Sequence, residues 1–152
     1  MKTHKTLYTV IIILLLCLWI PVAIDKLIYF QSFKTGILRQ PLNSNLQQLG
    51  IILLPPVEII TACLLTWNKL QKYGLILSSL LMSVFTIYVA VALVGGFGKI
   101  PCGCGSVISA LNWHQHLWFN LFFLMLSVYV IIINNNIFKL YQSHRINNFV
   151  NN

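Results

Sequence analysis

The stretch that decides the fold is LYTVIIILLLCLWIPVAI, residues 7–24, which contains no charged side chain. A helix needs about 20 consecutive apolar residues to cross the hydrocarbon core of a bilayer. Lys2 and Lys5 precede the stretch, and Asp25 and Lys26 follow it, so charged residues mark both of its ends. It is longer than the roughly 7–15 apolar residues of a signal peptide, and no small-residue cleavage site follows it. We therefore expect a retained transmembrane helix.

Three further apolar runs follow, at about residues 46–67, 74–94 and 113–133. The 152 residues are 58% hydrophobic and only 8% charged, whereas a soluble domain has about 25% charged residues. The chain therefore has too little charge to cover a water-facing surface. These features predict an all-α membrane protein, in which residues 1–152 form one four-transmembrane-helix bundle and residues 137–152 form a tail.

The net charge of +8 does not indicate nucleic-acid binding, because no basic patch with interleaved aromatic residues is present. The lysines and arginines flank the apolar runs, which predicts the lipid bilayer as partner. The positive-inside rule places both termini in the cytoplasm of a bacterial inner membrane, with the loop near residue 102 outside. The cytoplasmic side then has Lys2, Lys5, Lys69, Lys72, Lys139 and Arg145, and the outer side has Lys26, Lys34, Arg39 and Lys99.

The segment between the first two runs is too apolar for a solvated linker. Its apolar residues recur at roughly helical spacing, which predicts a short amphipathic helix on the outer interface that ends at Pro41. Ser44 and Gln47 have the spacing of a capping box for the second span. The apolar residues in question are Leu27, Phe30, Phe33, Ile37 and Leu38.

The sequence PCGCGS, residues 101–106, has two cysteines separated by one glycine. A disulfide between Cys102 and Cys104 would need a tight, strained turn, which Gly103 makes possible. A strained disulfide is more oxidising than a relaxed structural one, and so small a loop adds little stability. The motif therefore suits an exchangeable dithiol, although two reduced thiols packed at the membrane interface remain an alternative.

A metal site is a second alternative for this motif. Cys102 and Cys104 together with His114 and His116 resemble a four-ligand set for zinc or copper. Residues i and i+2 of a helix point about 200° apart, so both histidines could bind one ion only if the helix began after His116. Otherwise, with Trp118, they would belong to an aromatic and polar belt at the outer interface. In that case His116 is a candidate proton carrier.

Glu58 lies in LLPPVEII, near the middle of the second span. A carboxylate there costs about 3 kcal/mol on insertion scales unless it is neutral or paired, and such residues are candidates for functional sites. Pro55 and Pro56 interrupt the hydrogen-bond ladder just before it. Lys26 is the best partner by charge, and a protonated Glu58 hydrogen-bonded within the bundle is the structural alternative. The other polar partners considered are Asn120, Thr86 and Tyr88.

The other two cysteines, Cys17 and Cys63, fall inside the first and second spans. We expect both to be small, buried, apolar side chains.

The order of these features resembles the methylamine-utilisation protein MauE family, within the DoxX-like group of four-helix membrane proteins. The matching residues are a lysine at the outer end of the first span, Pro-x-Glu in the second, and Cys-x-Cys-Gly before the fourth. In this sequence they are Lys26, Pro56, Glu58, Cys102, Cys104 and Gly105.

The resemblance implies a redox-associated inner-membrane protein. The MauE family is linked to maturation of the disulfide-rich small subunit of methylamine dehydrogenase, and DoxX-like relatives are linked to thiosulfate and quinone redox chemistry. It implies Cys102, Cys104, Glu58 and Lys26 as the reactive site, an exported thiol or disulfide protein as client, and a membrane quinone as candidate cofactor. A metal-handling membrane protein and a non-enzymatic membrane subunit or chaperone are the alternatives.

Overall fold

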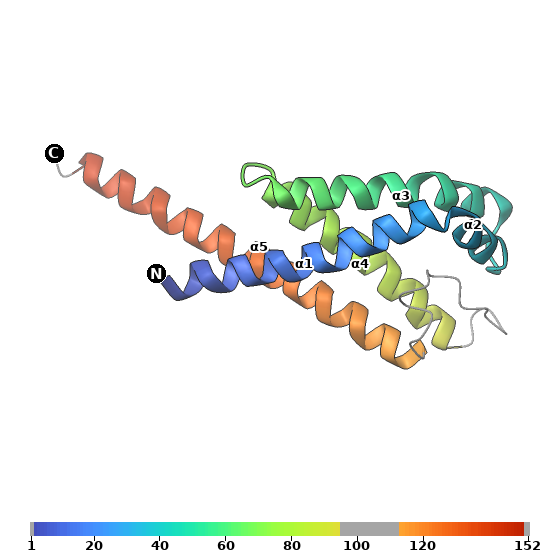
Figure 1. Ribbon diagram of the computed structural model, residues 1–152. Coiled ribbons are helices and arrows are strands. Elements are labelled where there is room, and N and C mark those ends of the chain that lie inside the picture. Colours follow the sequence, from blue (N-terminus) through green and yellow to red (C-terminus); the bar gives the residue numbers. More distant parts are fainter. Residues whose placement is uncertain (1, 95–112, 151–152) are drawn as a thin grey trace.

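A computed structural model describes the backbone of residues 2–94 and 113–150, and the side chains of residues 6–94 and 114–133. These parts of the chain form five helices and no strand (Figure 1). The helices are α1 (Lys2–Ile28), α2 (Phe30–Leu38), α3 (Ser44–Thr66), α4 (Gln71–Leu93) and α5 (Trp113–Val150). The predicted all-α class is confirmed.

Four helices are long and apolar enough to cross a membrane, as predicted. The candidate spans are Thr6–Ile28, Ser44–Thr66, Gln71–Leu93 and His114–Ile133. Each begins and ends within a few residues of its prediction, because charged and polar residues mark the ends of the apolar runs. The protein is therefore a multi-pass membrane protein. α5 continues well beyond its apolar part, so the predicted tail at 137–152 is helical as far as Val150.

α1 packs against α3, α3 against α4, and α4 most extensively against α5. Buried leucine, isoleucine and aromatic side chains of α1, α3, α4 and α5 form the core. Trp19 Nε1 of α1 donates a hydrogen bond to Ser78 Oγ of α4 at 2.9 Å, and Ser78 Oγ lies 3.3 Å from Ser127 Oγ of α5. These three side chains are buried, so the contact satisfies polar groups where no water is available.

α3 and α4 form a hairpin that is tight at its turn and wider at the other end. A Cβ added at Gly74 would lie 2.9 Å from the backbone nitrogen of Leu65, so a glycine is needed for this approach. Figure 1 shows α4 diverging from α3 as the two helices leave the turn. α2 lies at the wide end (Figure 1), and its buried Phe33 contacts Lys26 of α1. The amphipathic helix predicted after the first span is confirmed.

The expectation that Cys17 and Cys63 are buried is wrong. Both are free thiols exposed on the outside of the bundle. The physical reason is that lipid is as apolar as a protein core, so an apolar side chain in a span gains little by facing the neighbouring helices. Hydropathy therefore identifies a span without telling which of its faces is buried.

The predicted capping box at the start of α3 is also wrong. The N-cap residue is Asn43, with no capping hydrogen bond from its side chain, and Ser44 is already helical. Gln47 turns instead to the end of α2, where Nε2 donates to the carbonyl oxygens of Gln40 at 2.8 Å and Leu38 at 3.3 Å. Gln47 thus connects α3 to the end of α2. Leu38 is the last residue of that helix, and carbonyl groups in the last turn have no donor within the helix.

Candidate functional site

Lys26, near the end of α1, forms an ion pair with Glu58 of α3, through Nζ and Oε1. The Lys26 side chain is 7% exposed and that of Glu58 is fully buried. Charge alone had indicated this partner, and the structure confirms the pairing. Two of the uncharged partners considered for Glu58 form hydrogen bonds elsewhere. Thr86 Oγ1 donates to the carbonyl oxygen of Met82, and the Tyr88 hydroxyl donates to Gln40 Oε1.

Two prolines precede Glu58 within α3, which nevertheless runs without a break from Ser44 to Thr66. Pro55 and Pro56 have no N–H group, so the carbonyls one turn earlier lose their usual helical donors. Such gaps are tolerated in a membrane where neighbouring helices cover them. Pro55 is buried, in keeping with that requirement.

α2 covers the ion pair. The ring centroid of Phe33 lies 5.5 Å from Lys26 Nζ, within the range of a cation–π contact. Glu58 Oε2 has no hydrogen-bond partner among the residues that the structure describes. Burying two charges costs free energy that their attraction recovers only when the geometry is good and the remaining polar atoms are satisfied. A buried pair with an unsatisfied oxygen is therefore a weak source of stability, and points to a functional role.

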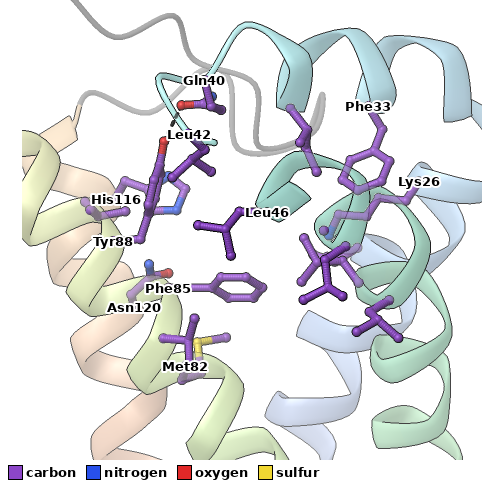
Figure 2. Close-up of a pocket in the computed structure, with 18 of the residues that line it drawn as sticks. Lys26, Phe33, Gln40, Leu42, Leu46, Met82, Phe85, Tyr88, His116 and Asn120 are labelled. Carbon is purple, nitrogen blue, oxygen red and sulfur yellow. Dashed lines mark hydrogen bonds between the residues drawn. The ribbon is translucent and has the colours of Figure 1, made fainter. Parts of the chain in front are cut away.

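A cavity of about 340 Å³ lies beside this pair and under α2 (Figure 2). Every helix contributes to its wall, and most of the lining side chains are aliphatic or aromatic. Five polar side chains lie at its edge, from α1, the segment after α2, α4 and α5. They are Lys26, Gln40, Tyr88, His116 and Asn120.

The polar side chains from α4 and α5 lie near one another at one side of the cavity (Figure 2). The hydroxyl group of Tyr88 donates a hydrogen bond to Gln40 Oε1. His116 and Asn120 are buried one turn apart on α5. Asn120 Nδ2 has no hydrogen-bond partner in the described part of the chain. From the sequence, Asn120 was expected only as a partner for Glu58, and Gln40 was not predicted as part of a site. Polar residues four apart in an apolar span were the available signal.

The two histidines do not converge. α5 begins at Trp113, so both His114 and His116 lie within the helix, where His114 is exposed and His116 buried. The condition for joint binding of one ion, a helix that starts after His116, is not met. No cluster of three or more His, Cys, Asp or Glu side chains occurs in the part of the chain that the structure describes.

Cys102 and Cys104 lie outside the described residues. The chain leaves α4 at Leu93 and enters α5 at Trp113, and both of these points lie at the end of the bundle that has α2 (Figure 1). This is also the end near which Lys26 and His116 line the cavity. The segment with the two cysteines is therefore anchored, at both of its ends, on the side of the molecule that has the polar site.

Comparison with known protein families gives a match. The sequence profile of the family described as methylamine utilisation protein MauE matches residues 4–133. The comparison with curated proteins returned no match, and neither did the comparison with solved structures. The matched region includes all four candidate spans, the Lys26–Glu58 pair and the two loop cysteines, and covers most of the 152 residues. The chain therefore belongs to the MauE family.

Proposed function

We propose that this protein is a thiol–disulfide relay of the bacterial inner membrane, which acts in the maturation of an exported, disulfide-containing client. Cys102 and Cys104 are the reactive pair, and they face the periplasm, while both termini lie in the cytoplasm. Family membership supports a place in methylamine utilisation. The observation that carries the proposal is the buried Lys26–Glu58 pair near the end of the bundle to which the cysteine segment is anchored.

The relay chemistry is a two-step exchange. A client thiolate attacks the Cys102–Cys104 disulfide and forms a mixed disulfide, and the second client thiolate resolves it. The client then has a new disulfide, and Cys102 and Cys104 are both reduced. Their reoxidation releases two electrons and two protons, which reduce one membrane quinone to its quinol.

We assign the handling of the protons to the Lys26–Glu58 pair. No described residue forms a hydrogen bond with Glu58 Oε2, so this oxygen has a lone pair available to a proton. Lys26 lines the cavity and stabilises the carboxylate form of Glu58. Intramembrane acidic residues frequently serve in proton relays.

The test is a redox titration of the purified protein in detergent, with alkylation of free thiols and mass analysis. In a Cys17→Ser/Cys63→Ser background, a Cys102–Cys104 disulfide should appear as a loss of two alkylated thiols. Its potential should lie above the about −300 mV of structural disulfides. Cys102→Ser or Cys104→Ser should leave the protein folded, and one of the two should accumulate a mixed disulfide with a client in cells.

The dithiol relay is wrong if no intramolecular disulfide forms at any potential. A disulfide that is reduced only when the potential falls below about −300 mV would be a structural crosslink, and that result would also contradict the proposal. The Cys17→Ser/Cys63→Ser protein with Cys102 and Cys104 also replaced by serine is the control, since it should show no thiol change across the titration.

A further inference from the structure

The cavity under α2 has a hydrogen-bond donor that the described chain does not use. Asn120 is 3% exposed and lines the cavity, and its Nδ2 has no hydrogen-bond partner within residues 6–94 and 114–133. An unsatisfied amide in apolar surroundings is costly, and buried polar groups in membrane-spanning segments mark functional sites. Asn120 lies at the edge of the cavity (Figure 2), so a rotation of its amide group would let a molecule inside the cavity accept this hydrogen bond.

The electrostatics of the cavity favour a neutral molecule. Among the described residues that line the cavity, Lys26 is the only lysine or arginine, and it is already paired with Glu58. An anionic ligand would have to compete with the Glu58 carboxylate for the same ammonium group. The Asn120 amide can bind a neutral oxygen without displacing any contact, so a carbonyl oxygen fits the available chemistry.

The size and the aromatic lining of the cavity favour a flat ring. Its volume of about 340 Å³ lies within the about 300–1,000 Å³ of small-molecule sites. Trp19 and Phe85, with ring centroids 6.5 Å apart and planes inclined at 40°, both line it, as do Phe33, Tyr88 and Phe119. Aromatic side chains favour stacked or edge contacts with another ring.

The cavity is accessible from the side of the bundle. Leu46 and Leu49 of α3 are each 56% exposed and Val84 of α4 is 55% exposed, and all three belong to the lining. α3 and α4 diverge toward this end (Figure 1). In a membrane such an opening faces lipid, so an apolar molecule could enter without passing through water.

We propose that this cavity is a binding site for a neutral, flat, lipid-soluble carbonyl compound, whose carbonyl oxygen accepts a hydrogen bond from Asn120 Nδ2. Binding does not require the cysteines. A quinone belongs to this chemical class, so under the proposed relay the same site would hold the electron acceptor, and that part of the inference rests on the proposed function.

The test compares two ligands that differ only in their carbonyl groups, 2,3-dimethyl-1,4-naphthoquinone and 2,3-dimethylnaphthalene. The methyl groups block the ring positions at which thiols add. Binding is measured by equilibrium dialysis against the detergent-purified Cys102→Ser/Cys104→Ser protein, with protein-free micelles as the reference. Because this protein has no dithiol, failure of the relay cannot affect the result.

The naphthoquinone should bind about three- to tenfold more tightly than the hydrocarbon. This ratio corresponds to the net free energy of one hydrogen bond. Asn120→Leu, which is close in size and lacks the amide, should remove this preference and keep hydrocarbon binding. Gly50→Phe should abolish binding of both ligands by filling the cavity. Gly50→Ala is its control, because a Cβ there is only in ordinary contact, 3.5 Å from Ile37 Cδ1.

Equal binding of the two ligands would show that the cavity does not recognise a carbonyl group. This comparison of ligands does not need the Asn120→Leu variant, so it is valid even if that variant fails to fold. A preference that survives Asn120→Leu would overturn the role of Asn120. Binding that survives Gly50→Phe would place the ligands elsewhere. If methyl oleate, a linear ester with the same carbonyl group, displaces the naphthoquinone at equal concentration, the occupant is an acyl lipid and the flat-ring proposal is wrong.

Discussion

Glu58 is one of only two acidic residues in the sequence, and it is fully buried against Lys26. Neither charge could remain alone at this depth, since an isolated buried charge costs several kcal/mol after relaxation. The pair is nevertheless a poor way to stabilise a bundle, because apolar residues of similar volume would serve as well or better. We infer that stability does not explain why the chain has this pair.

A double-mutant cycle tests that inference. Lys26→Met and Glu58→Gln should each destabilise the protein by about 3–5 kcal/mol, because each leaves one buried charge without its partner. The double variant should recover most of that loss, since neither charge is then present. Reversible unfolding of the detergent-solubilised protein measures all three variants against the unmodified one.

The control for this cycle is Thr86→Val, which removes a hydroxyl group that donates to the carbonyl of Met82 in its own helix. It should change stability little in every background. If the double variant is as unstable as the sum of the single ones, the two side chains do not stabilise each other and the ion pair contributes nothing to the fold.

Residue-level prediction from sequence succeeded where few candidates existed. With so few charged residues in the spans, the partner of Glu58 was almost determined by charge, and Lys26 is that partner. Asn120 shows the limit. Its polar side chain was visible in the sequence, but the cavity that it borders depends on how five helices pack, and a linear pattern contains no record of that packing.

The α3–α4 hairpin is the element on which the cavity depends. Near the turn the two helices are as close as a glycine permits, because a Cβ at Gly74 would lie 2.9 Å from Leu65 N and 3.0 Å from Leu64 C. Both are backbone atoms and cannot rotate away. The helices separate from this point toward α2 (Figure 1), which leaves space between them for the cavity.

Gly74→Ala should therefore destabilise the protein by about 1–3 kcal/mol, the usual cost of overpacking. Gly50→Ala is the matched control within α3, because its Cβ would meet its nearest neighbour at 3.5 Å. It should stabilise by about 0.5–1 kcal/mol through the better helix propensity of alanine. Thermal unfolding in detergent compares the two. Equal stability of the two variants would show that α3 and α4 can separate freely at the turn.

Element boundaries were predictable because charged and polar residues end the apolar runs, and α2 was predictable from its own apolar spacing. The faces of the spans were not, as Cys17 and Cys63 show. In a soluble protein, the buried face of a helix is apolar and its exposed face is polar, so the sequence distinguishes the two faces. A helix in lipid is apolar on both faces, so the sequence does not distinguish them. The anchoring of α2 by Gln47 was missed for a related reason, since a local motif offered a simpler role for the same residue.

At the scale of the whole molecule, the two ends of the bundle differ. One end has the N-terminus and the turn between α3 and α4, and the other has α2, the end of α4 and the start of α5 (Figure 1). The cationic residues predicted for the cytoplasmic side include Lys69 in that turn, and those predicted for the outer side include Lys34 in α2. The arrangement of the helices is thus compatible with the charge bias, and labelling decides which end faces out.

The last prediction concerns this orientation. In intact cells and a Cys17→Ser/Cys63→Ser background, a membrane-impermeant maleimide should label Cys102 and Cys104 after mild reduction. The reason is that the positive-inside rule places six cationic residues on the opposite side of the membrane and four on the side of these cysteines.

Lys69→Cys, made in a protein with all four native cysteines replaced by serine, is the matched probe of the other end of the bundle, because Lys69 is exposed in the turn after α3. It should be labelled only after the membrane is permeabilised. The reverse pattern would invert the topology, and because the cysteines would then face the reducing cytoplasm, it would also remove the basis for a relay to an exported client.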